Sequence, residues 1–336
     1  MKKPIIFLTL ILVLTILISL CMGKYPISIN DIVNFAKSYI SNLPVIDDPR
    51  QYQILKNILI NIRLPRIMAA ILIGAALSVS GATFQSMFIN PLVSPGLLGV
   101  LAGASFGASV GMVLAKSWIM VQMGAFMFGL IAVAAALGLS MLNRSDRLLM
   151  LILGGIISSA LFTSLLSVIK YLADPYDQLP AIVYWLMGSI SAVDNATVFT
   201  LCGPITGGIF ILLLLSGYLN ILSMGDEEAR SLGVNVILLR SCFILLATII
   251  SALTVVLGGM IGWVGLLIPH VARMIVGPDN RILLPVSALI GAIYLLIADN
   301  MARLLFSVEI PIGIITSLIG IPFFAFLLHK TKKGWN

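Results

Sequence analysis

The sequence predicts an all-α protein that crosses a membrane several times. Two features of composition lead to this class: 60% of the 336 residues are hydrophobic and only 10% are charged. The mean hydropathy is +1.12, and the ionisable residues stand between long apolar runs. A soluble domain carries about 25% charged residues. Most of this chain must therefore contact lipid or other apolar helices.

The predicted spans follow from the stretches that contain no ionisable residue, because one crossing needs roughly 20 apolar residues. Four such stretches fit one helix each: Lys3 to Lys24, Arg147 to Lys170, Arg281 to Asp299 and Glu309 to Lys330. Two are too long for one helix and are interrupted inside: Arg66 to Lys116 by Asn90-Pro91, and Arg240 to Arg273 by Gly258-Gly259. With one span from Lys116 to Arg144 and one from Asp194 to Asp226, we expect about ten.

The N-terminal run after Lys2 and Lys3 has the basic start of a signal peptide. It lacks a small-residue cleavage site, and Leu20 stands before Cys21, so we expect an uncleaved first helix. The three cysteines, an odd number in apolar segments, indicate packed thiols rather than disulfides.

The orientation follows from the basic residues. With ten spans and an inner N-terminus, both ends are cytoplasmic, and the short loops obey the positive-inside rule. Six of the outer basic residues fall in one polar segment, from Lys24 to Arg66. The net charge of +7 is dispersed between spans, which favours anionic headgroups over nucleic acid as the partner.

Two segments break the helical pattern at membrane depth: residues 90–96, and the stretch from Gly258 to His270. Irregular backbone is tolerated there only where protein or water covers it. Gly81 precedes Pro91 by the same ten residues that separate Gly259 from Pro269. This spacing hints at a repeat, with halves at 57–170 and 236–329 of a single domain over 1–336.

His270 follows Pro269 at the second break. No second histidine, cysteine or carboxylate stands nearby to complete a metal site, so we expect a structural hydrogen bond rather than a ligand. His329, beside Lys330, is expected at the cytoplasmic end.

Two polar interruptions point to opposite sides of the membrane. Residues 173–180 carry two prolines and two carboxylates, so they should lie outside, either as a helix that gates a pathway or as a surface loop. The segment 225–234 (GDEEARSLGV) has acidic residues first, then Arg230, and then Gly233. This order suits the dipole and the end of a short helix. On the cytoplasmic side it is either a knob that contacts a partner or a bare loop.

Other function classes fit less well. An ion-coupled secondary transporter, the main alternative, usually places carboxylates inside the membrane. Here the acidic residues stand near span ends, with Asp299 and Asp194 the closest to being buried. An intramembrane enzyme would need a nucleophile with its base, or a metal set such as His-Glu-x-x-His, and neither is present.

Several ordered motifs between about Asn61 and Leu328 resemble the FecCD family, the membrane permeases of ATP-binding-cassette (ABC) importers for iron chelates and vitamin B12. The motifs are Arg63-Leu64-Pro65-Arg66, Gly81-Ala82-Thr83-Phe84-Gln85, Asn90-Pro91-Leu92, the segment 225–234, the run from Gly262 to His270, and Pro311-Ile312-Gly313.

The resemblance implies a ten-helix subunit of a bacterial cytoplasmic membrane that pairs with a second copy of itself. Two ATPase subunits would bind ATP and Mg²⁺ inside, and a soluble binding protein would dock outside. This chain has no Gly-x-x-x-x-Gly-Lys-Ser/Thr loop for nucleotide, and we expect no cofactor in it. Ferric siderophore is the commonest cargo of similar permeases, while haem, cobalamin and molybdate or tungstate stay open.

The resemblance also assigns three groups of residues. Those expected to couple to the ATPase are Glu227, Ala229, Arg230, Leu232 and Gly233. Those expected to meet carboxylates of the binding protein are Arg63, Arg66 and Arg303, which could instead anchor headgroups. Those expected at the pathway and its broken helices are Gln85, Asn90, Pro91, Gly258, Gly259, Pro269 and His270.

Overall fold

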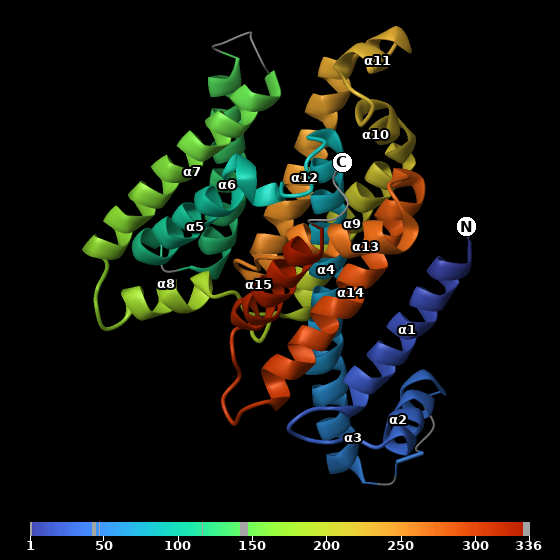
Figure 1. Ribbon diagram of the computed structural model, residues 1–336. Helices are drawn as coiled ribbons and strands as arrows, with labels where there is room; N and C mark the ends of the chain where they lie inside the picture. Colours follow the sequence, from blue (N-terminus) through green and yellow to red (C-terminus); the bar gives the residue numbers. More distant parts are fainter. Residues whose placement is uncertain (1, 42–44, 47, 116, 142–146, 332–336) are drawn as a thin grey trace.

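The computed structural model describes residues 2–41, 45, 46, 48–115, 117–141 and 147–331, and within these ranges the chain forms helices and no strand (Figure 1). The α-helices in chain order are α1 (Lys2–Cys21), α2 (Ile29–Ser41), α3 (Pro49–Lys56), α4 (Leu64–Met87), α5 (Val100–Val110), α6 (Trp118–Ser140), α7 (Arg147–Leu172), α8 (Gln178–Leu186), α9 (Asn195–Leu214), α10 (Ser216–Leu222), α11 (Asp226–Ser231), α12 (Val236–Gly258), α13 (Val264–Val276), α14 (Asn280–Leu304) and α15 (Ile312–Thr331). Two π-helical segments, η1 (Asn57–Arg63) and η3 (Gly111–Ala115), and one 3₁₀ segment, η2 (Pro95–Leu98), complete the set.

Seven of the described helices are long and apolar enough to cross a bilayer. Three shorter apolar helices lie among them, over Val100–Ala115, Val264–Val276 and Ile312–Phe326. At 1.5 Å per residue, the 13 residues of α13 extend about 20 Å, less than the roughly 30 Å of a hydrocarbon core. The multi-pass, all-α class is thus confirmed, whereas a count of ten spans, seven plus three, stays a prediction.

Both long apolar stretches divide into two helices, as predicted. The chain leaves α4 through a loop in which Ile89 has φ 49° and Gly99 has φ 87°. It leaves α12 at Gly259, φ 66°, and enters α13 through Trp263, φ 69°. These left-handed conformations cannot continue a helix, and side chains other than glycine rarely adopt them. The breaks are therefore built into the backbone.

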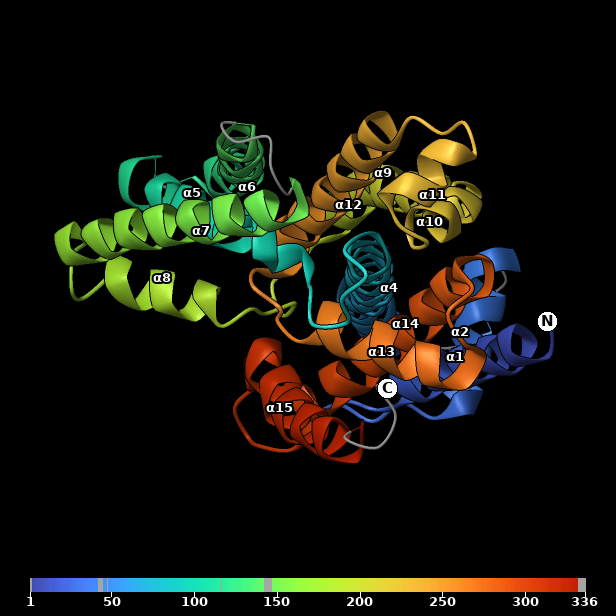
Figure 2. The same ribbon diagram turned by 45° about the horizontal axis from the view of Figure 1, so that its top comes forward.

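Helix α4 occupies the centre of the molecule, with α12, α13 and α14 packed around it (Figures 1 and 2). Nearly all of its residues are buried. Glycines allow the close approach: a Cβ on Gly74 would clash with the backbone of Gly291, and one on Gly81 with the backbone of Gly265. Small residues at helix crossings let backbones meet in this way.

The outer N-terminal region differs from the expectation of a second span that begins near Arg66. Helices α3, η1 and α4 form one continuous helix over Pro49–Met87, 39 residues long. Its first turns extend beyond α14 to the end of the molecule where α2 lies (Figure 1). A small apolar cluster that includes Phe35, Leu55 and Leu59 holds α2 against this extension.

The helices of the two predicted repeat halves follow one order: a long helix, a break, a short helix and then two more helices. The order is α4, α5, α6 and α7 in the first half and α12, α13, α14 and α15 in the second. The repeat itself stays a prediction. The thiols of Cys21, Cys202 and Cys242 are free and half-buried.

Candidate functional sites

The segment 225–234 forms the short helix that its charges predict. Gly225 enters α11 with φ 118°, and Asp226 receives two hydrogen bonds from Arg240 of α12, at 2.7 and 3.2 Å. The methyl group of Ala229 is buried against the body of the protein. Glu227 and Arg230 instead point into solvent. The helix is thus anchored on one side and presents its charges on the other, at one extreme of the molecule (Figure 1).

Gly233 ends α11, as predicted. With φ 77°, it donates its amide to the carbonyl of Arg230 at 2.9 Å, and Val234 donates to the carbonyl of Ala229 at 3.3 Å. This pair of bonds is the Schellman arrangement, which favours glycine in the left-handed position. Leu232, just before it, has an exposed side chain. An exposed leucine and an exposed arginine beside a rigid turn form a compact contact surface.

A polar network links α10, which packs against α11, to the central helices. Asn220 of α10 donates to Asp279 at 2.6 Å and accepts from both the backbone and the side chain of Asn280 at 2.8 Å. Asn280 in turn accepts from the Ser86 hydroxyl at the end of α4, at 2.7 Å. The bonds from Asn220 and from the Arg281 amide hold the pKa of Asp279 below its usual value. Displacement of α10 and α11 would therefore reach α4 and α14 directly.

Gln85 ties α4 to the short helix α13. Its amide group donates to the carbonyl of Leu266 at 3.0 Å, and its oxygen accepts from Arg273 at 3.1 Å. Gln85 is buried. These bonds connect α4 to α13, and the predicted role of Gln85 at the pathway stays a prediction.

The predicted second irregular segment is shorter than expected, because Val264 to His270, with Pro269, belong to helix α13. The first irregular segment packs against the start of α13. Pro95 is buried and packs on Gly265, and Leu98 is buried as well. Asn90 caps its own turn by accepting the amide of Leu92 at 2.9 Å. Protein thus covers Pro95 and Leu98, whereas Ile89 and Leu92 at the start of the loop are exposed.

The second break also receives the segment that follows α8. The amide of Ser189 donates to the carbonyl of Gly258 at 2.9 Å. Gly188, with φ 72°, and Gly313 both approach the carbonyl of Met260 so closely that a Cβ would clash. Three stretches far apart in sequence therefore meet at the Gly258-Gly259 break.

The structural hydrogen bond expected for His270 is not formed at Nδ1. This atom is buried and has no hydrogen-bond partner among the described residues. The ring instead meets the ring of Phe324 at 6.5 Å, edge to face. An aromatic contact holds His270 because helix α15, rather than a polar group, lies opposite it.

The outer arginines are buried and bound within the chain. The guanidinium of Arg63 donates to the carbonyls of Leu20 and Tyr25, where α1 ends. Arg66 lies 2.7 Å from Asp299 and 2.9 Å from Glu309. Arg303, one turn after Asp299, is 3.2 Å from that carboxylate. The docking role of these arginines stays a prediction. Docking would require the arginines to release their partners within the chain.

Asp299 is fully buried, as its sequence position allowed, but its charge is balanced by two guanidinium groups. A carboxylate held by two arginines is a poor proton relay, because its charge is already compensated. Asp194, by contrast, is exposed. It caps α9 by accepting the amide of Thr197 at 3.0 Å, and this bonding lowers its pKa. Neither acid resembles an ion-coupling site.

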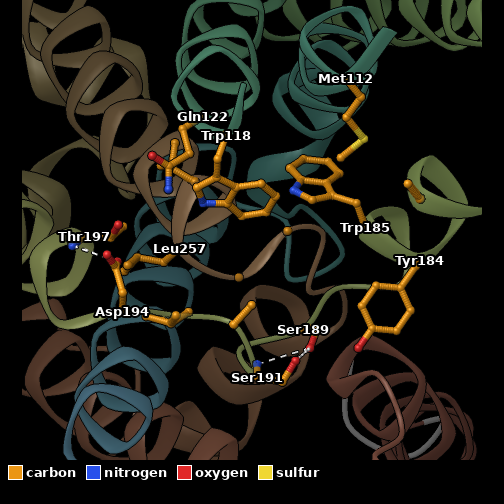
Figure 3. A pocket seen from close by; sticks show the side chains of 16 residues that line it. Met112, Trp118, Gln122, Tyr184, Trp185, Ser189, Ser191, Asp194, Thr197 and Leu257 are labelled. Atoms are coloured by element: carbon orange, nitrogen blue, oxygen red, sulfur yellow. Dashed lines mark hydrogen bonds between the residues drawn. The ribbon is translucent and has the colours of Figure 1, made fainter. Parts of the chain in front are cut away.

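The stretch 173–180 turns through Asp174, whose carboxylate accepts the amides of Tyr176 and Asp177, and then enters α8. A cavity of about 260 Å³ lies behind α8 (Figure 3). Tyr184 and Trp185 of α8 face it from one side, and Trp118 and Gln122 of α6 from another. Sequence reasoning missed this cavity, since its walls come from four separate segments. It leaves α8 room to move, and a gating role stays a prediction.

Comparison with known proteins agrees with this architecture. The model of the FecCD transport family matches residues 11–330. The molybdate import permease MolB of Haemophilus influenzae is 40% identical over 99% of this chain and 97% of its own length. A probable iron chelatin permease of Helicobacter pylori is 40% identical over 82% of this chain and 83% of its own.

A solved structure has the same fold. It is a metal-chelate type ABC transporter in an inward-facing conformation, 39% identical, with a TM-score of 0.88 over 98% of this chain and all of the other. Family, relatives and fold agree over nearly the whole length. The chain belongs to the FecCD transport family, the permease subunits of ABC transporters whose ATPase resides in a separate subunit.

Proposed function

We propose that this chain is the permease of an ABC importer that brings a metal-containing solute into the cytoplasm. The single observation that carries the proposal is α11: a charged helix anchored through Asp226 and Arg240 that presents Glu227 and Arg230 to solvent. In this proposal the ATPase binds the surface formed by α11 and the turn after it, with contacts to Glu227, Ala229, Arg230, Leu232 and Gly233. The network from Asn220 to Ser86 carries its movement into α4 and α14.

The assembly that we propose has two copies of this chain, two ATPase subunits that hold ATP and Mg²⁺, and a soluble binding protein outside a bacterial cytoplasmic membrane. The outer face around Arg63, Arg66 and Arg303 receives the binding protein, with Glu309 as the partly exposed member of the cluster. Cargo is ferric siderophore or molybdate, as the names of the two relatives indicate, with haem, cobalamin and tungstate as further candidates.

The test is the variant Arg230→Glu in proteoliposomes that hold the importer with its ATPase subunits and binding protein. Uptake of radioactive molybdate and of ferric siderophore is measured with ATP. We expect uptake of the true cargo to fall at least tenfold, because a reversed charge on α11 repels the surface that received the arginine. ATP hydrolysis continues without transport.

A control is Lys3→Glu, which makes the same reversal of charge at an exposed position at the start of α1, away from α11 and from the proposed docking face. It should leave uptake unchanged. Normal uptake by the Arg230→Glu variant would remove the coupling role of α11. Uphill uptake driven by an ion gradient, with no second polypeptide present, would refute the ABC assignment as a whole.

A further inference from the structure

We infer that α2 lies on the membrane surface and inserts one apolar face into the leaflet at the end of the molecule opposite α11 (Figure 1). The partner of this face is the phospholipid bilayer, and the leaflet is the outer one in the predicted orientation. The inference goes beyond the proposed function, because it requires only a multi-pass membrane protein and is independent of the cargo and of the ATPase.

Helix α2 has two apolar faces, and only one of them packs on the protein. On the inner face, Phe35 is 4% exposed and belongs to the cluster that contains Leu55 and Leu59 of the long central helix. The other face consists of four apolar residues at intervals of four, three and four: Ile29, Val33, Ala36 and Ile40. This spacing follows the turn of an α-helix, so the four residues form one line, which we call the α2 stripe.

The α2 stripe is exposed. Ile29 is 70% exposed, Val33 43% and Ile40 82%, and Ala36 is half-buried between them. Single apolar side chains are common on protein surfaces, but a contiguous apolar row marks a surface that contacts another molecule or a membrane. The packing of Phe35 fixes the direction of the stripe, because the two faces of one helix cannot both turn toward the protein.

The depth of α2 is set by its contact with α1. Leu20, in the last turn of α1, packs against the same cluster as Phe35, and α2 lies beside this end of α1 (Figures 1 and 2). Helix α1 contains a candidate span of 19 residues, Lys3–Cys21, which extends about 28 Å and so matches a hydrocarbon core. Its side chains, such as Phe7 and Leu10, are exposed and face lipid. The stripe therefore lies where acyl chains meet headgroups, whereas a soluble partner would remain in water.

Residues that prefer this depth accompany the stripe. Tyr25, before α2, and Tyr39, near its end, are both exposed, and tyrosine is enriched at the boundary between membrane and water. Lys37 is exposed and directly follows Ala36. Its long side chain can lie along the apolar surface and bring the ammonium group to lipid phosphates. An apolar face with a lysine and tyrosines beside it is typical of a helix in the interface plane.

A cap at its N-terminus makes α2 a helix before any contact with lipid. The Ser28 hydroxyl donates to the Asp31 carboxylate at 2.7 Å, and the Asp31 amide donates to the Ser28 hydroxyl at 3.1 Å. Asp31 is the single acidic residue of α2 and stands four residues before Phe35, so it lies on the inner face. The stripe therefore carries no negative charge that would oppose its insertion.

The first test measures depth with nitroxide labels on the full chain in vesicles of phosphatidylethanolamine and phosphatidylglycerol. The three native cysteines are replaced by serine, and one cysteine is introduced as Ile40→Cys or, as the matched control, Asn30→Cys. Asn30 is exposed on the same helix but outside the stripe. We expect the label at position 40 to collide more with oxygen, which dissolves in lipid, than with a nickel chelate in water. The label at position 30 should show the reverse.

The second test needs no substitution, so it remains valid if the cysteine variants do not fold. The unmodified chain is irradiated in vesicles that contain a phospholipid with a diazirine on its acyl chain, and tryptic peptides are analysed by mass spectrometry. We expect lipid adducts on the peptide of residues 25–37, on Ile29 or Val33. The peptide that contains α1 is the positive control.

Four results would overturn the inference. They are equal access of the nickel chelate to both labels, adducts on α1 without any on residues 25–37, magnetic broadening between the position-40 labels of two molecules, and protection of that label only after the binding protein is added. The third result would assign the stripe to a second copy of the chain, and the fourth to the binding protein. ATP-driven uptake is measured separately, so failure of either proposal leaves the other intact.

Discussion

Two clusters of charge at opposite ends of the molecule, both marked by sequence motifs, are built in contrasting ways. At the inner end, α11 leaves Glu227 and Arg230 in solvent and uses only Asp226 for an internal ion pair. At the outer end, Arg66 and Arg303 are 6% and 7% exposed and share the buried carboxylate of Asp299. The charges of one cluster face solvent, and those of the other join helices.

The difference teaches that an arginine in a motif has no fixed role. Arg230 lies on a six-residue helix at the edge of the fold, with its side chain exposed. Arg66 lies in the central helix α4, which packs against α14. The guanidinium of Arg66 therefore needs an internal carboxylate, since an unpaired buried charge is costly. The same residue type is exposed at one end, where we propose a coupling role, and holds helices together at the other.

The largest effect is expected from a substitution that disrupts the outer cluster of Arg66, Arg303 and Asp299. Asp299→Asn leaves two buried guanidinium groups without their shared counter-charge, and we expect the free energy of unfolding to drop by about 3–5 kcal/mol. The measurement is loss of the folded complex in detergent on heating, followed by fluorescence or by size-exclusion chromatography.

Glu309→Gln is the matched comparison, because it removes the other carboxylate of the cluster at a partly exposed position. It should cost much less, about 1 kcal/mol or below. Equal stability of Asp299→Asn and the wild type would show that the outer cluster does not hold the helices together.

A smaller effect is expected at the inner end. Gly233→Ala keeps the surface of α11 but strains its last residue, whose φ is 77°, by about 1–2 kcal/mol. No atom lies within 4 Å of the added methyl group, so the strain acts on the backbone alone. We expect transport to fall several-fold, with the global melting temperature nearly unchanged.

Gly207→Ala in α9 is the control for this change, because that glycine is helical and its added methyl group also meets nothing. Its transport should equal that of the wild type. If Gly233→Ala transports equally well, the rigid turn after α11 is not needed for coupling.

The smallest effect concerns acid sensitivity at the α10–α14 junction. The pKa of Asp279 is lowered in the fold by Asn220 and the Arg281 amide. Its contribution to stability is therefore present above its unfolded pKa of about 3.9 and is lost as the pH falls through the lower folded value. The difference in melting temperature between the wild type and Asp279→Asn should be smaller below pH 4 than at pH 7. A constant difference between pH 7 and pH 3 would contradict this linkage.

Much of the architecture could be read from the order of residues. The intervals without charges located the long helices, and Pro91 and Gly259 marked the two breaks, because proline and left-handed glycine end helices locally. The start, charges and end of α11 were likewise local signals, with Gly233 as the clearest. The extension of α4 back to Pro49 was missed, since the polar segment before Arg66 carries no span-like apolar run.

The candidate sites could be predicted only in part, because the residues that interact in them come from distant parts of the chain. Asp299 lies 233 residues from Arg66, and its pairing depends on where α14 crosses α4. His270 has an aromatic neighbour rather than the expected polar one because Phe324 of α15 packs there.

The sequence by itself determined the membrane class, the breaks in the helices and the short charged helix α11, since apolar length, backbone conformation and helix dipoles act over a few residues. Only the tertiary structure decided which charges face solvent and which face each other. Burial depends on the crossing of helices such as α4 and α14, and the low dielectric there makes an enclosed charge costly unless it is paired.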